Sequence, residues 1–143
     1  FEDGLAQLLR QDHGRVSVER ILSGPGLAAL HRAVGGVSTP PDAELWRMAL
    51  DGDDPFAVDA LNRFCRIFGA TAGDLALAHG ASAVVIGGGI GLRLARHLPT
   101  SGFPHSFVAK GRFTDYMHRI PVRLITHAQP GLLGAASLGL SGG

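Results

Sequence analysis

The sequence predicts an α/β fold in which helices cover a sheet, and three observations support this. Three apolar β-formers, Val84–Ile86, lead directly into the glycine cluster Gly87–Gly89, which is followed by a helical pattern. A long helical pattern from Pro55 to about His79 precedes this strand, and a second apolar run, 122–125, follows it. Alternation of helices and strands is typical of layered folds with a sheet between helices.

Composition indicates one globular domain. The chain has 143 residues, of which 45% are hydrophobic and 17% charged, enough to bury one core. Its 13 Lys and Arg against 12 Asp and Glu give a net charge of +1, and the basic residues are scattered, so nucleic acid is not an expected partner. The charge distribution is more consistent with a small-molecule ligand than with nucleic acid.

Compartment and completeness follow from other features of the sequence. A single cysteine excludes an internal disulfide, and no apolar run approaches the roughly 20 residues that span a bilayer. We therefore expect a cytoplasmic protein without membrane partners. The chain begins at Phe1 without a signal-peptide pattern, so we also expect it to be a piece of a longer polypeptide.

The first elements in order are a short amphipathic helix at about 5–12 and an apolar segment at 16–22. Glu19 lies within this apolar segment, so we expect its carboxylate near a buried edge. The alternative is a salt bridge with Arg20 or another neighbouring base. Residues alone leave both interpretations open.

A second helix is expected to begin within Ser23–Gly24–Pro25–Gly26. Proline favours the first helical position, which would make Gly24 the N-cap and leave first-turn N–H groups facing outward. This segment is a candidate anion site, with a purely structural helix start as the alternative.

A loop at 35–41 and a short helix at about 43–50 come next, followed by the long helix. Asp54 as N-cap with Pro55 at N1 explains the acidic cluster 51–54 better than a calcium loop does, because the downstream bidentate Glu is missing. Cys65 is expected to be a small core residue, and Gly80 to end the helix.

The C-terminal part predicts a short helix through Tyr116 and Met117, the second strand, and a small-residue helix at 130–138. Lys110 and Arg112 are candidates for a phosphate contact, with solvated surface charges as the alternative. The seven histidines show no metal-ligand spacing, so we predict no metal site.

The glycine cluster is the strongest candidate ligand site. Glycines let the backbone approach a nucleotide closely, although many α/β domains use such turns only for packing. The Rossmann pattern is not satisfied, since Leu92 stands where its last glycine would be, so a nicotinamide cofactor is not expected.

Several of these segments together, in order and spacing, resemble the C-terminal part of bacterial glucokinases. The resemblance covers nearly the whole chain and rests on four segments: 19–27 (Glu-Arg-Ile-Leu-Ser-Gly-Pro-Gly-Leu), 85–90, 110–113 and 121–134. It implies a ribonuclease-H-like lobe of the actin-like ATPase superfamily, incomplete, with helices packed on a mixed sheet. Residues 1–143 would then be the C-terminal portion of the larger lobe of a two-lobe sugar kinase, with the N-terminal lobe absent.

The resemblance also implies an activity and binding residues. Such kinases transfer the ATP γ-phosphoryl to the 6-hydroxyl of glucose with Mg²⁺. Glu19 would bind the sugar hydroxyls, Gly87, Gly88 and Gly89 would pack against the nucleoside, and Ser23, Gly24 and Gly26 would lie beside the nucleotide.

The catalytic groups of the family find no match here. Its phosphate loop, its catalytic Asp base and its Glu-x-x-His sugar clamp are expected upstream of Phe1, so we expect the isolated chain to be inactive. A non-catalytic sensing module derived from a sugar kinase, and an unrelated nucleotide-binding domain, remain alternatives. The resemblance leaves a homodimer open.

Overall fold

The computed structural model describes residues 17–37, 40–127 and 129–132. Most of the helix expected at 130–138 and all of that expected at 5–12 lie outside these residues. The elements are α2 (Val18–Ile21), α3 (Gly24–Ala33), α4 (Asp42–Asp51), α5 (Pro55–Ala78), β1 (Val84–Ile86), α6 (Gly88–Leu94), η1 (Leu98–Thr100), α7 (Phe103–Val108), η2 (Gly111–Phe113), α8 (Thr114–Met117) and β2 (Val122–Leu124).

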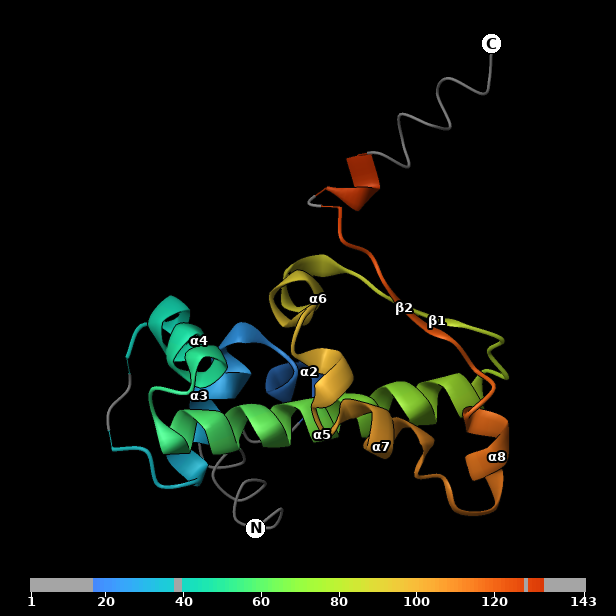
Figure 1. The fold of residues 1–143 in the computed structure, drawn as a ribbon, viewed down its shortest axis with the longest axis horizontal. Helices are drawn as coiled ribbons and strands as arrows, with labels where there is room; N and C mark the ends of the chain where they lie inside the picture. The colour runs from blue at the N-terminus through green and yellow to red at the C-terminus, as the bar shows by residue number, and fades with distance from the viewer. Residues whose placement is uncertain (1–16, 38–39, 128, 133–143) are drawn as a thin grey trace.

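Helix α5 is the axis on which the other helices pack. Figure 1 shows it running horizontally, with α3 and α4 near its N-terminal end and α7 against its middle. Its first turn is capped by Asp54, whose Oδ1 accepts a hydrogen bond of 2.6 Å from the Ala57 N–H. After the C-cap His79, Gly80 adopts a φ of 59°, a conformation that favours glycine. The predicted bounds of this helix are confirmed.

A series of aromatic ring contacts connects α4, α5 and α7 through the core. Trp46 meets Phe64 edge to face at 5.3 Å between ring centroids, and Phe68 meets Phe103 in the same way at 5.2 Å. Phe103 then stacks on Phe107 at 6.0 Å. Such pairs add about 0.5–1.5 kcal/mol each beyond the area that they bury. The helical half of the molecule therefore has a continuous core of its own.

Helices α5 and α7 approach each other closely because α5 presents two glycines to α7. A Cβ atom at Gly69 would overlap the carbonyl oxygen of Phe103, and one at Gly73 would overlap that of Phe107. Cys65 lies on the same helix and is fully buried, as predicted. Burial raises the pKa of its thiol to about 11.

The strands β1 and β2 form a parallel two-stranded sheet, with Val84 opposite Val122 and Ile86 opposite Leu124. The expected mixed sheet is therefore not what the described residues form. The expected burial of the first strand was also only partly right. Ile86 is 6% exposed but Val85 is 59% exposed, because within the described residues helices cover only one face of these strands.

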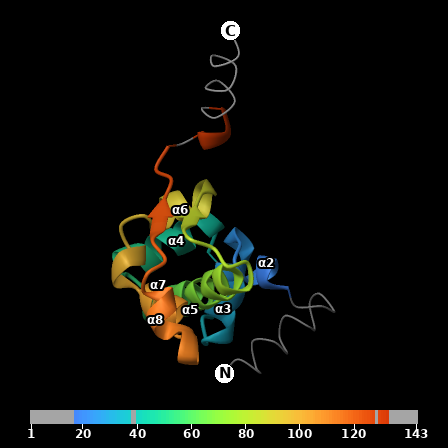
Figure 2. The ribbon, with the colours of Figure 1, turned by 90° about the vertical axis from the view of Figure 1, so that its right-hand side faces the viewer.

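Figure 2 looks nearly along α5 and shows how the elements surround it. Helices α7 and α8 lie on one side of α5, and α2 lies on the other. Both segments that the sequence singled out, the start of α3 and the turn after β1, lie away from the contact between α5 and α7.

Candidate functional site

Glu19 lies on α2, a four-residue surface helix that buries none of its residues. The expectation that its carboxylate is held at a buried edge is therefore wrong, because the adjacent apolar side chains do not draw this helix into the core. No salt bridge or hydrogen bond joins Glu19 to Arg20 or to another side chain in the described ranges. Glu19 instead lines a polar pocket of about 620 Å³ together with Ser17, Arg20 and Ser23.

Ser23 is the N-cap of α3. Its Oγ accepts a hydrogen bond of 3.2 Å from the Gly26 N–H and donates one of 2.8 Å to the Arg20 carbonyl oxygen. The prediction that Gly24 would cap this helix is wrong, because serine supplies a side-chain acceptor that glycine lacks. Pro25 consequently occupies the second helical position rather than the first.

The two glycines at this helix start have different surroundings. Gly26 is buried, and a Cβ atom there would overlap the Ile21 carbonyl oxygen, so the contact between α2 and α3 requires glycine. Gly24 is half-buried and faces α4, where a Cβ atom would lie 3.2 Å from Oδ2 of Asp42. Only Gly24 of this pair leaves backbone partly open to solvent.

The glycine turn after β1 is open. Gly87, Gly88 and Gly89 are all exposed, and a Cβ atom at Gly88 or Gly89 would meet nothing within 4 Å. At Gly87 the nearest atom would be Cδ1 of Ile125 at 3.5 Å. Gly88 has a φ of 87°, which strains any residue with a Cβ atom, so glycine is required there by conformation. No core side chain covers this turn.

One apolar groove of about 560 Å³ brings Glu19 and Gly87 to the same surface. We call it the α2–β1 groove: α2, the C-terminal half of α5, and β1 with its preceding loop form its walls. Three of its lining residues are large hydrophobic side chains that are exposed: Val18, Leu75 and Val85. The candidate sugar residue and the start of the candidate nucleoside turn thus border one concavity.

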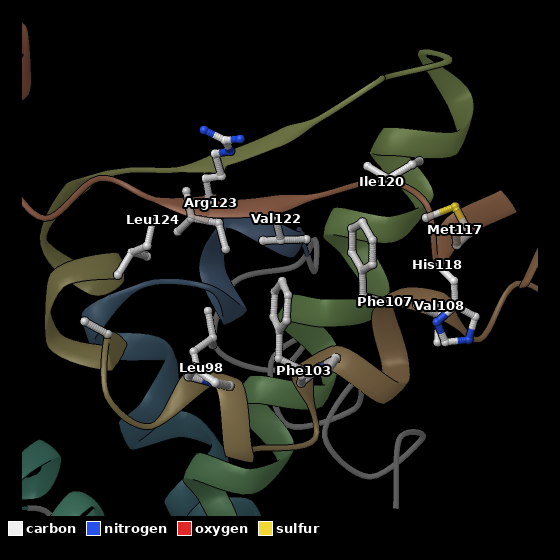
Figure 3. Close-up of a pocket in the computed structure, with 14 residues that line it drawn as sticks. Leu98, Phe103, Phe107, Val108, Met117, His118, Ile120, Val122, Arg123 and Leu124 are labelled. Atoms are coloured by element: carbon white, nitrogen blue, oxygen red, sulfur yellow. The ribbon is translucent and has the colours of Figure 1, made fainter. Parts of the chain in front are cut away.

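Sequence reasoning missed a second cavity, of about 350 Å³ (Figure 3). It lies between β2 and the segment from η1 to α8, and its lining includes Leu98, Phe103, Phe107, Met117 and Ile120. These apolar residues resemble ordinary core positions in the sequence, so no local signal marks the space between them. None of the predicted site residues lines it.

Lys110 is a structural residue rather than a phosphate contact. Its Nζ lies 2.7 Å from Oδ1 of Asp74 and donates a hydrogen bond of 2.8 Å to the Ala70 carbonyl oxygen, both on α5. Lys110 is therefore neither a phosphate contact nor a solvated surface charge, the two interpretations that the sequence left open. Arg112 is exposed, and its guanidinium lies 4.9 Å from the Phe113 ring centroid.

Metal-ligand clusters and membrane-spanning helices are both absent from the described residues. They contain no group of three or more His, Cys, Asp or Glu side chains that could hold a metal ion. None of the helices among them is long and apolar enough to cross a membrane.

The fold and this surface define a helix-rich α/β unit in which an open glycine turn and Glu19 border the same groove. The family model described as glucokinase matches residues 1–141, and the chain belongs to the glucokinase family.

Similar proteins extend this assignment over most of the chain. The glucokinase of Zymomonas mobilis is 56% identical over 142 residues, which are 96% of this chain and 44% of that protein. The glucokinase of Pectobacterium atrosepticum is 44% identical, with coverage of 95% and 44%. The crystal structure of a glucokinase from an Antarctic psychrotroph superposes with a TM-score of 0.83 at 38% identity, covering 96% of this chain and 44% of that one. The chain thus spans less than half the length of these relatives.

Proposed function

We propose that this chain is the C-terminal portion of the larger lobe of a glucokinase, an enzyme that transfers the γ-phosphoryl of ATP to the 6-hydroxyl of glucose. Family membership and the 44% coverage of the Zymomonas mobilis glucokinase support this assignment over a sensing module. A ribonuclease-H-like lobe in a cytoplasmic enzyme is part of the same proposal. The parallel strands and the helices that cover one of their faces are compatible with it.

Glu19 binds the sugar in this proposal, and its placement is the observation that carries it. The carboxylate is exposed on the wall of a polar pocket, with no partner among the described side chains. A carboxylate accepts hydrogen bonds from two adjacent hydroxyls at once, and charge-assisted bonds are about twice as strong as neutral ones. Ser17 lines the same pocket and adds a hydroxyl group to it.

The nucleoside of ATP packs on Gly87–Gly89, whose exposed backbone lets a flat ring approach closely. Gly24 lies beside the nucleotide with partly open backbone. Ser23 and Gly26 act indirectly, because the hydroxyl of Ser23 is engaged in two hydrogen bonds and Gly26 is buried. These two residues fix the path of the chain between α2 and α3.

The described residues contribute binding rather than the chemical step. Phosphoryl transfer depends on positioning and on charge neutralisation, usually by Mg²⁺ held between protein and phosphates. No cluster in residues 17–37, 40–127 or 129–132 fits such an ion, so we assign it no ligand here. Without a base beside the sugar, we expect no glucose phosphorylation by the 143-residue chain alone.

The test compares Glu19→Gln with Asp115→Asn in binding titrations of the chain with glucose and, separately, with Mg·ATP. Gln loses the charge and replaces one accepting oxygen with a donor. Losing a hydrogen bond to a charged group costs about 1.5–3 kcal/mol, so the glucose Kd should rise about tenfold to a hundredfold in Glu19→Gln. The ATP Kd should not change.

Asp115 is a matched control, since it is also an exposed carboxylate at the second residue of a four-residue helix and lines neither the polar pocket nor the α2–β1 groove. Asp115→Asn should bind both ligands as the unmodified chain does. An unchanged glucose Kd in Glu19→Gln, or an equal loss for glucose and ATP, would contradict the sugar role of Glu19.

A further inference from the structure

Arg93 ties α6, the helix that follows the glycine turn, to the core of the molecule. Its guanidinium carbon lies 5.0 Å from the ring centroid of Trp46 on α4, and its Nη1 lies 3.5 Å from Oδ2 of Asp42 on the same helix. Trp46 is 1% exposed and packs edge to face on Phe64 of α5. An exposed cation therefore lies over a ring that the core holds rigidly.

Helix α6 depends on this contact more than the longer helices would. It has seven residues, of which only Gly91 and Leu94 are buried. Glycine contributes no side-chain packing, so Leu94 is its single buried side chain. The orientation of α6, and with it that of the glycine turn at its start, depends on few contacts: those of Leu94, of the partly buried Ile90 and of Arg93.

Asp42 links the same junction to the start of α3. The oxygen that faces Arg93, Oδ2, is also the atom that a Cβ atom at Gly24 would approach to 3.2 Å. One carboxylate thus lies against the backbone at the start of α3 and contacts a side chain of α6, the helix that the glycine turn begins. The charge of Arg93 also offsets a carboxylate that would otherwise repel the phosphates of a nucleotide near Gly24.

We propose that Arg93 and Asp42 are positioning residues of the nucleotide site, which hold the glycine turn and the start of α3 in a fixed position relative to each other. This inference rests on the nucleotide site proposed above. It assigns a function to an ion pair that would otherwise count as an ordinary surface contact, for which large effects on stability are not expected.

The test uses Trp46, which is the only tryptophan in the sequence and lies under Arg93. The chain, Arg93→Met and Arg93→Lys are titrated with Mg·ATP and with adenosine while tryptophan emission is recorded. Arg93→Met should bind Mg·ATP about tenfold more weakly, a loss of the size of one stacked cation with its ion pair. Adenosine binding should weaken less, because it carries no phosphate for Asp42 to repel. Arg93→Lys should recover part of the ATP affinity.

The matched control is Arg47→Met. Arg47 lies on α4, the helix of Trp46, and follows Trp46 in the sequence. Arg47 is bound to Glu44, Asp51 and Asp53 at the surface. Its removal should leave the ATP Kd within twofold. Amide hydrogen exchange without nucleotide adds an independent measurement. Arg93→Met should speed exchange at both Gly26 and Gly91, the buried glycines of α3 and α6, whereas Arg47→Met should change neither.

The outcomes separate this inference from the proposed function. No ATP binding by the unmodified chain would contradict the nucleotide site itself, while faster exchange at both glycines would still support the link between α6 and α3. ATP binding that is equal in the unmodified chain and in Arg93→Met would overturn the positioning role alone. Exchange changes confined to α6 would overturn the role of Asp42 as the link.

Discussion

Two parts of the molecule differ in how completely they bury their hydrophobic residues. One is the helical half, formed by α3, α4, α5 and α7, and the other is the sheet side, formed by β1, β2 and the α2–β1 groove. In the helical half, α3, α4, α5 and α7 enclose Leu27, Leu45, Trp46 and Phe64, none of which is more than 1% exposed. On the sheet side, Val85 and the facing Leu75 are both more than half exposed and line the α2–β1 groove. Hydrophobic side chains of the same types therefore stabilise one half and remain in contact with water in the other.

The difference indicates where this chain is self-sufficient and where it is not. A two-stranded sheet is marginally stable by itself, and three or more strands or helical cover on its faces are usual. The strands here have helical cover on one face within the described residues. The sheet side carries the open glycine turn and borders Glu19, so the less enclosed half is also the half with the candidate binding site.

Truncating one leucine in each half of α5 should give the largest contrast in stability. Leu61→Ala, at a residue 1% exposed, should lower the free energy of unfolding by about 2–5 kcal/mol, because it leaves a cavity in the core. Leu75→Ala, on the same helix but 56% exposed, should change it by less than about 0.5 kcal/mol. Urea unfolding followed by circular dichroism measures both. Equal losses would mean that the groove is enclosed in solution.

Glycine substitutions should give the second contrast. Gly73→Ala places a methyl group against the Phe107 carbonyl oxygen, and backbone cannot move aside cheaply, so we expect a loss of about 1–3 kcal/mol despite the better helix propensity of alanine. Gly89→Ala meets nothing within 4 Å and should be neutral within about 0.5 kcal/mol. Thermal unfolding of the two variants measures both changes in stability. A Gly73→Ala variant as stable as the unmodified chain would show that α7 can shift away from α5.

The buried thiol of Cys65 should give a smaller, pH-dependent effect in the helical half. Burial raises its pKa from the usual value of 9.0 to about 11, so the unfolded chain loses this proton first as the pH rises. The unfolded state therefore binds fewer protons between pH 9 and 11, and the free energy of unfolding should fall over this window, by at most about 2 kcal/mol. The stability difference from Cys65→Ala, measured at each pH, isolates this effect. A difference that stays constant from pH 8 to 11 would contradict it.

Features set by neighbouring residues were predictable from the sequence. Asp54 followed by Pro55 defines the start of α5, and Gly80 after His79 its end, because capping chemistry operates within one turn. The glycine turn after Val84–Ile86 was recognised for the same reason. At the start of α3, however, the sequence predicted Gly24 as the cap, whereas the hydroxyl of Ser23 accepts the capping hydrogen bond.

Features set by distant residues were not predictable. Lys110 pairs with a carbonyl group 40 residues earlier in the chain, and no local pattern indicates that contact. The exposure of Val85 depends on which faces of the strand receive helices, whereas three consecutive apolar residues indicate only that a strand is present. For Glu19, the family resemblance supplied a proposed role, whereas the surroundings predicted from its apolar neighbours were wrong.

The glycines that let α7 approach α5 also bear on how the long helix forms. Each glycine inside a helix costs about 1 kcal/mol relative to alanine, and Gly69 and Gly73 both lie in the C-terminal half of α5. The N-terminal half has a capping carboxylate and contains no glycine, so it does not carry this cost. The C-terminal half gains its stability only when the backbone of α7 packs on these glycines. In this chain the formation of a local helix is thus coupled to a contact with a segment more than 30 residues further along, so the second half of α5 and α7 fold as one cooperative unit.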